Sequence, residues 1–172
     1  MQLPTAMPDD APSTTVSAST SADATTLWAL VTDPSASAPF SEEFQGARWK
    51  DTAGVTPPAL GARFVGRNAR KETEWTTLCT VTEHEHERAF GWTVMALTDP
   101  VSSWTFRITP TDAGADLSYT ALMGPSMLSG LNQAIAEHPD KRESYTTGRL
   151  DRLARSMRAT VEGLIARAEQ GA

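Results

Sequence analysis

The sequence has a single cysteine, no long apolar run and more acidic than basic residues. Because Cys79 stands alone, an internal disulfide is excluded and no paired cysteine ligands for a metal exist, which suits a reducing cytoplasm. No apolar segment approaches the roughly 20 residues that cross a bilayer. A formal net charge of -6 argues against non-specific binding to nucleic acid or to anionic membranes. We therefore expect a cytoplasmic protein with no nucleic-acid partner and no membrane span.

The sequence also lacks the short motifs of common catalytic and cofactor sites. It contains no Gly-x-Ser-x-Gly nucleophile motif, no phosphate loop and no dinucleotide fingerprint. Nucleotide and hydride chemistry are therefore disfavoured, and we expect no cofactor. His84 and His86 alternate with glutamates, so that two imidazoles share one face of a strand and resemble part of a metal site. Because no third ligand is suggested elsewhere, we expect a solvated hairpin tip without a metal.

The length of 172 residues fits one domain that can bury a sizeable core. Residues 1–13 hold Pro4, Pro8 and Pro12 but no basic region followed by an apolar one, so they do not form a secretion signal. We interpret residues 1–13 as a disordered N-terminal tail and residues 14–170 as a single domain.

The domain is organised around a helix expected over residues 143–168. Its apolar side chains recur at steps of three and four, and charged side chains occupy the opposite face. The arginines of that face alternate with carboxylates, and we interpret them as solvated. A stripe of this length needs a broad apolar surface to cover. The stripe consists of Leu150, Leu153, Ala154, Met157, Val161, Leu164, Ile165 and Ala168.

Short β-type runs separated by turn residues precede this helix. Their alternation predicts a meander of antiparallel strands, to which a weaker alternation over residues 15–20 adds a first strand. Seven strands are enough to curl around a long helix. The six runs of the meander are residues 47–51, 61–69, 73–83, 88–97, 102–109 and 115–123, with turns at Gly54 and Pro57-Pro58, at Asp99-Pro100 and at residues 112–114.

A short helix is expected between the first strand and the meander. Leu27, Trp28 and Val31 give it an apolar face, and Ser21 or Asp23 can cap its start. The dipeptide Asp33-Pro34 then ends it. Residues 39–43 form a second helical turn or a loop that returns the chain to the sheet.

Alternation also assigns the inner face of the sheet. Trp104 and Phe106 share one side of their strand, and the parity of the next strand places Tyr119 on the same face. The same rule turns Trp75 and Trp92 inward. The face that the long helix covers is therefore expected to be rich in aromatic side chains.

The order of these elements resembles the START-like or SRPBCC superfamily, which includes polyketide cyclases and lipid carriers. Several phrases are similar to its polyketide-cyclase-like branch: "ATTLWALVTDP" (24–34), "LGARFVGRN" (60–68), "EWTTLCTVTE" (74–83), "AFGWTV" (89–94) and "SSWTFRITP" (102–110). The resemblance implies an α+β helix-grip fold, in which a curved antiparallel sheet of about seven strands wraps around a long C-terminal helix. It also implies a cavity between the sheet and that helix. The architecture serves many functions, so it does not by itself identify one.

Residues 124–138 stand between the last strand and the long helix and depart from the family pattern. They can form a helix that Pro139 ends, with Leu128, Leu131, Ala134 and Ile135 facing inward. Such an addition either acts as a lid over one mouth of the cavity or extends the core.

We expect the cavity to bind a small hydrophobic ligand that is aromatic, polyketide-like or lipid-like. The expected ligand-binding residues are Phe64, Asn68, Trp75, Thr77, Trp92, Trp104, Phe106, Tyr119 and Met157. One alternative is a cofactor-free cyclase or dehydratase that uses the same cavity, with Asn68 and Tyr119 as polar groups. No carboxylate or histidine is predicted on the inner face, so this enzyme lacks a named proton acceptor and its catalytic residues are unknown. A second alternative is a protein-interaction module with a filled cavity. The ligand, turnover and oligomeric state are left open, with a homodimer as one possibility.

Overall fold

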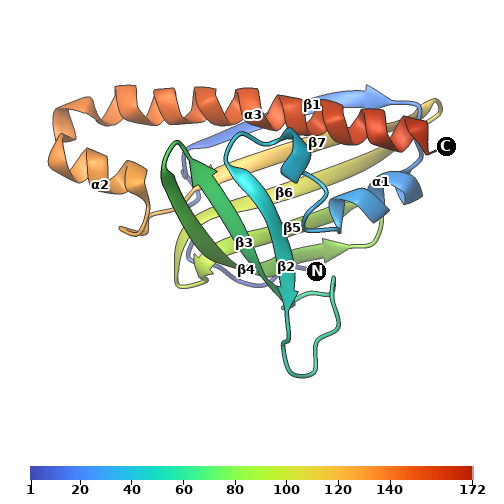
Figure 1. The fold of residues 1–172 in the computed structure, drawn as a ribbon, viewed down its shortest axis with the longest axis horizontal. Helices are drawn as coiled ribbons and strands as arrows, with labels where there is room; N and C mark the ends of the chain where they lie inside the picture. The colour runs from blue at the N-terminus through green and yellow to red at the C-terminus, as the bar shows by residue number, and fades with distance from the viewer. Residues whose placement is uncertain (172) are drawn as a thin grey trace.

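The protein consists of one curved sheet that wraps around one long helix (Figure 1). The structure, a computed structural model, describes residues 1–171. Seven antiparallel strands form the sheet in the order β1-β7-β6-β5-β4-β3-β2. The α+β helix-grip fold expected from the sequence is confirmed. The strands are β1 (Ser13–Thr20), β2 (Phe44–Lys50), β3 (Arg63–Arg70), β4 (Thr73–Glu85), β5 (Ala89–Ala96), β6 (Asp99–Thr111) and β7 (Gly114–Met123).

The turn between β5 and β6 differs from the expectation. Asp99 pairs with Ala96 and Pro100 with Met95, so the chain reverses at residues 97–98 and not at Asp99-Pro100. The register shifts between Val94 and Met95. Such an irregularity tolerates a proline, which has no N–H to donate to the ladder. Pro100 is therefore part of the strand, although the dipeptide is typical of a turn.

Helix α1 (Ala24–Val31) begins as the sequence predicts. The Asp23 carboxylate accepts a hydrogen bond of 2.8 Å from the backbone N–H of Thr26, which satisfies one of the free donors of the first turn. The helix ends before Pro34. A single 3₁₀ turn, η1 (Ala38–Phe40), then leads into β2.

Helix α3 (Arg142–Gln170) covers the concave face of the sheet. Its stripe is buried as expected except at Leu150 and Ala154, which are half-buried, and Val161, Met157 and Leu164 are each at most 2% exposed. Burial of each such side chain contributes about 1.5–3 kcal/mol. Thr160, which periodicity did not place in the stripe, is also buried, and its hydroxyl donates to the carbonyl of Ser156 at 3.1 Å. No described helix is both long enough and apolar enough to cross a membrane.

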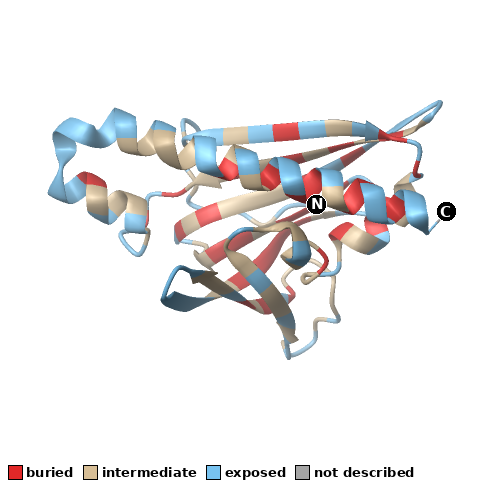
Figure 2. Cartoon of the chain, turned by 45° about the horizontal axis from the view of Figure 1, so that its top comes forward, coloured by how far each residue is buried: buried red, intermediate tan, exposed pale blue. Residues whose placement is uncertain are grey.

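The start of α3 and the short helix α2 (Gly130–Glu137) extend beyond the end of the sheet (Figure 1). Most of this extension is exposed or half-buried (Figure 2). Ile135 is buried at 5%, as expected, but Leu128 is 64% exposed, so the prediction that it faces inward is wrong. The reason is that Leu128 lies in the turn before α2 begins and does not belong to its periodic face. A 3₁₀ turn, η2 (Pro139–Lys141), connects α2 to α3.

The first residues of the chain lie along the end of β4. The backbone N–H of Leu3 donates to the carbonyl of Thr82 at 2.8 Å, and Gln2 forms a bridge with Glu83. This edge is available because the backbone hydrogen bonds that join β4 to β3 and to the residues before it end at Val81, which bonds with Gly61 and Ala62. The division of the chain into a tail and a domain at residue 13 stays a prediction.

Candidate functional site

A cavity of about 210 Å³ lies between the concave face of the sheet and α3. Strands β3 to β7 form one wall, α3 forms another, and the segment from Asp33 to Phe44 closes a third side. All the residues proposed from the sequence to bind a ligand line this cavity. That these residues contact a ligand stays a prediction. They are Phe64, Asn68, Trp75, Thr77, Trp92, Trp104, Phe106, Tyr119 and Met157.

Stacked aromatic side chains form most of the sheet wall. Phe106 and Tyr119 are directly opposite each other on β6 and β7, and their rings are parallel within 10° at a centroid distance of 4.0 Å. Trp104, on the same strand as Phe106, lies 5.6 Å from Tyr119. Trp92 is opposite Trp104 and contacts Phe106 at 6.0 Å. This continuous surface follows from strand alternation, which turns every second residue toward the helix.

Tyr119 brings a polar group to the aromatic wall. Its side chain is 7% exposed, and no hydrogen bond joins its hydroxyl to another of the residues 1–171. Every fully buried side-chain N or O atom of the described chain has a hydrogen-bond partner. The unpaired Tyr119 oxygen is therefore not fully buried and keeps some accessible surface. Burial, with a smaller effect of the nearby Cys79 thiol, raises the pKa of the Tyr119 phenol. The hydroxyl therefore stays neutral and can donate one hydrogen bond into the cavity.

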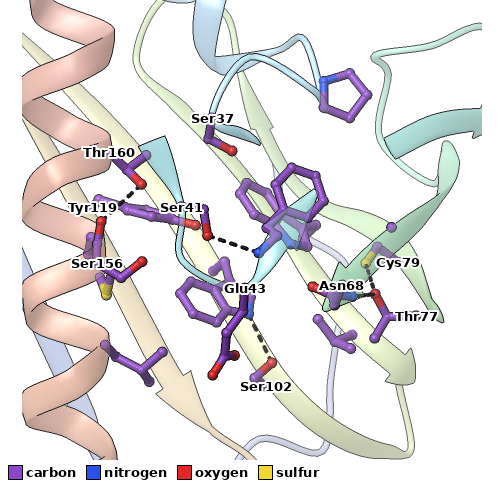
Figure 3. A pocket seen from close by; sticks show the side chains of 18 of the residues that line it. Ser37, Ser41, Glu43, Asn68, Thr77, Cys79, Ser102, Tyr119, Ser156 and Thr160 are labelled. Atoms are coloured by element: carbon purple, nitrogen blue, oxygen red, sulfur yellow. Dashed lines mark hydrogen bonds between the residues drawn. The ribbon is translucent and has the colours of Figure 1, made fainter. Parts of the chain in front are cut away.

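A second polar group faces the cavity from β3 and β4. The Asn68 amide donates to the Thr77 hydroxyl at 3.4 Å, and the Cys79 thiol approaches the same oxygen at 3.8 Å. Burial raises the pKa of Cys79 to about 12, so the thiol is not a nucleophile at neutral pH. Figure 3 shows Asn68, Thr77 and Cys79 on one side of the pocket, and Tyr119, Ser156 and Thr160 on the other. A polar ligand group therefore finds partners at two separate places.

An ion pair stands at the mouth of the cavity. Glu43, which directly precedes β2, accepts two hydrogen bonds of 2.9 and 3.2 Å from the guanidinium of Arg149 on α3. Both side chains are about one-quarter exposed. The described strands themselves bring no carboxylate to the cavity lining, and Glu43 reaches it from the segment before β2, which alternation does not cover. The interpretation of Arg149 as a solvated residue is wrong. The two residues are 106 positions apart, so periodicity gives no signal for their contact.

The two histidines of the acidic run lie away from this cavity. A register shift between Val81 and Glu83 reverses the alternation of β4, so the rings of His84 and His86 contact Trp28 of α1 at 5.2 and 5.4 Å. His86 is exposed, but His84 is half-buried, and this burial lowers its pKa. The expected solvated hairpin tip is therefore correct for His86 only. Within residues 1–171, no three His, Cys, Asp or Glu side chains are grouped as metal ligands.

Comparison with known proteins gives the same fold. A polyketide-cyclase-like protein from Corynebacterium glutamicum is 25% identical, with a TM-score of 0.60 over 92% of this chain and 90% of that chain. A protein from Mesorhizobium loti is 20% identical, with a TM-score of 0.56 over 88% and 96%. An aromatase/cyclase from a Streptomyces species is 12% identical, with a TM-score of 0.61 over 92% and 93%. Among curated proteins, none matches the sequence.

The family match covers most of the domain described above. Residues 11–162 match the family described as polyketide cyclase / dehydrase and lipid transport, from the start of β1 to the last third of α3. The resemblance inferred from the sequence phrases is confirmed. The chain belongs to the polyketide cyclase / dehydrase and lipid transport family.

Proposed function

We propose that this protein binds a small, mainly apolar molecule in the cavity between its sheet and α3. The observation that carries the proposal is a cavity of about 210 Å³ with an aromatic wall and with the Tyr119 hydroxyl, which has no partner within the described chain. Apolar pockets with a few polar groups are typical of small-molecule sites. Because side chains do not fill the cavity, an interaction module with a filled cavity has no support.

The size of the cavity limits the ligand. Pockets for drug-sized molecules measure about 300–1,000 Å³, so a cavity of about 210 Å³ suits a one- or two-ring aromatic or a medium-length acyl chain. A larger ligand must extend out of the mouth. The Tyr119 hydroxyl favours a ligand with a carbonyl or another acceptor near its buried end. Such an acceptor receives a hydrogen bond from the hydroxyl, whereas a pure hydrocarbon would leave the hydroxyl without a partner.

A cofactor-free cyclase or dehydratase is the second candidate. The neutral Tyr119 phenol favours it, since such a group can donate a hydrogen bond to a carbonyl that develops negative charge. Glu43 is a carboxylate at the same cavity, but Arg149 occupies both of its oxygens. Catalysis would require Glu43 to be released from Arg149 so that it could accept a proton, whereas ligand binding requires no such change.

Fluorescence titration tests the binding proposal, because Trp92 and Trp104 lie on the cavity wall. We expect flat aromatic and acyl ligands to change the intrinsic fluorescence saturably, and native mass spectrometry to detect a small molecule that co-purifies with the protein. The binding proposal is wrong if no ligand of the panel gives a saturable change and no molecule co-purifies. Conversion of a bound polyketide-like ligand to a cyclised or dehydrated product would favour the second candidate.

A further inference from the structure

A wide groove continues from the mouth of the cavity along the outside of the molecule. It has a volume of about 910 Å³ and lies between the β3–β4 hairpin and the extension formed by α2 and the start of α3. The groove shares several lining residues with the cavity, so that the two spaces are continuous. Among the shared residues are Glu43, Trp75, Trp104, Arg149 and Arg152.

The charge of this groove is opposite to that of the whole protein. The chain carries a formal net charge of -6. Among the described residues that line the groove, however, four are cationic, Arg70, Lys71, Arg149 and Arg152, and only Glu43 is acidic. Glu74 precedes Trp75 in β4 and lies on the opposite face by alternation. The groove is therefore a local cationic region, next to a mainly apolar cavity whose lining also includes Asp33 and Glu42.

The mouth already holds one carboxylate, that of Glu43, which binds to arginine side chains. The guanidinium of Arg149 binds both oxygens of Glu43 at 2.9 and 3.2 Å, and Arg70 lies 4.0 Å from one of them. This fork geometry is the one that arginine uses to recognise planar anions. Arg152 lies one helical turn below Arg149 on α3, lines both spaces, and makes no ion pair in the described chain. The mouth can therefore receive a second carboxylate beside the first, or in its place.

We propose that the mouth is a subsite for the carboxylate of an amphipathic ligand, with Arg149 and Arg152 as its partners and Glu43 as the internal group that occupies Arg149 when no ligand is bound. The apolar part of the ligand enters the cavity, and the carboxylate stays at the half-exposed mouth. The ligand class is a fatty or aryl carboxylic acid. This inference rests on the proposed binding function and adds the charge of the ligand to it.

A matched set of ligands tests whether the protein prefers a negatively charged ligand. Decanoate, methyl decanoate and decanol present nearly the same chain, and only the first is anionic at neutral pH. We expect decanoate to bind about tenfold more tightly than the ester or the alcohol, because hydrogen bonds between charged groups are stronger than neutral ones. This preference falls as salt is added, because the mouth is partly exposed. Tryptophan fluorescence and calorimetry both measure it.

Single substitutions then identify the partners. Arg152→Gln is expected to reduce the preference for decanoate several-fold and to leave the ester unchanged. Glu43→Gln frees the Arg149 fork and is expected to raise the affinity for decanoate several-fold, again without effect on the ester. Arg155→Gln is the matched control, since Arg155 is exposed on the same helix and lines neither space. Melting temperatures confirm that each variant is folded.

The outcomes separate this inference from the function on which it rests. If all three ligands bind equally to the parent protein and Glu43→Gln changes nothing, the carboxylate subsite is wrong and the apolar binding function stands. If decanoate is preferred but Arg155→Gln abolishes the preference as Arg152→Gln does, the attraction is a general charge effect and the assigned subsite is wrong. If none of the three ligands binds, the binding function itself fails.

Discussion

The ring of Phe40 lies directly against the backbone of α3 at Gly163, where a β-carbon would overlap the ring. Phe40 belongs to η1, in the segment that closes one side of the cavity. We expect Gly163→Ala to lower the free energy of unfolding by about 1–3 kcal/mol, because the overlap outweighs the gain in helix propensity of about 1 kcal/mol. Chemical denaturation measures the change.

Gly148→Ala is the matched control on the same helix. A β-carbon at Gly148 meets no atom within 4 Å, so only the helix propensity changes. We expect this variant to be more stable than the parent by about 0.5–1 kcal/mol. If Gly163→Ala is stabilised to the same extent as Gly148→Ala, the Phe40 ring does not lie where the structure places it.

Val161 tests the burial of the α3 stripe. Its side chain is 1% exposed, so Val161→Asp places an unpaired carboxylate in the core and is expected to unfold the domain or to destabilise it by more than about 4 kcal/mol. Ala159→Asp introduces the same charge two positions away on the exposed face and is expected to cost less than about 1 kcal/mol. Equal melting temperatures for the two variants would contradict this assignment of the buried face.

Tyr119→Phe separates ligand binding from stability. The substitution keeps the ring stacked on Phe106 and removes a hydroxyl without a partner in the described chain, so we expect no loss of stability. A ligand with a buried carbonyl is expected to bind about five- to thirtyfold more weakly, which corresponds to about 1–2 kcal/mol. A hydrocarbon of the same shape serves as the control. A parallel loss for both ligands would show that the hydroxyl makes no bond to the carbonyl.

The raised pKa of Cys79 predicts how the free energy of unfolding changes at alkaline pH. Its pKa is raised to about 12 in the folded protein from 9.0, so between these pH values the folded thiol keeps a proton that the unfolded thiol loses. The free energy of unfolding therefore falls as the pH rises through this window, by up to about 1.4 kcal/mol per pH unit for this one group. Cys79→Ala is expected to reduce that slope. An unchanged slope would mean that the thiol ionises equally in both states.

Periodicity is sufficient to predict the strands and the buried stripe of α3, whereas the helix-grip arrangement is implied by the resemblance to a known superfamily. The steps of three and four in α3 identified Met157 and Val161 as buried, and alternation in β6 turned Trp104 and Phe106 inward, because both patterns depend only on local geometry. The cavity wall follows from these two patterns together.

The mouth of the cavity could not be predicted in the same way. Glu43 and Arg149 meet only because the segment before β2 is folded back against α3, and no local pattern encodes a contact across 106 positions. The inward turn of His84 was missed for a different reason. It depends on a register shift between Val81 and Glu83. The one extra residue there reverses the face to which the following residues of β4 point.

The position of β1 at the edge of the sheet affects how the chain is made. β1 pairs with β7 alone among the described strands, and the concave face is covered by α3 together with α1 and the segment from Asp33 to Phe44. A nascent chain leaving the ribosome therefore holds β1 without its partner until nearly the whole sheet has been synthesised. Until α3 follows, the tryptophan-rich face is open to water and to other chains. A chaperone that binds apolar surface therefore has a target in the interval between the synthesis of the sheet and the docking of α3.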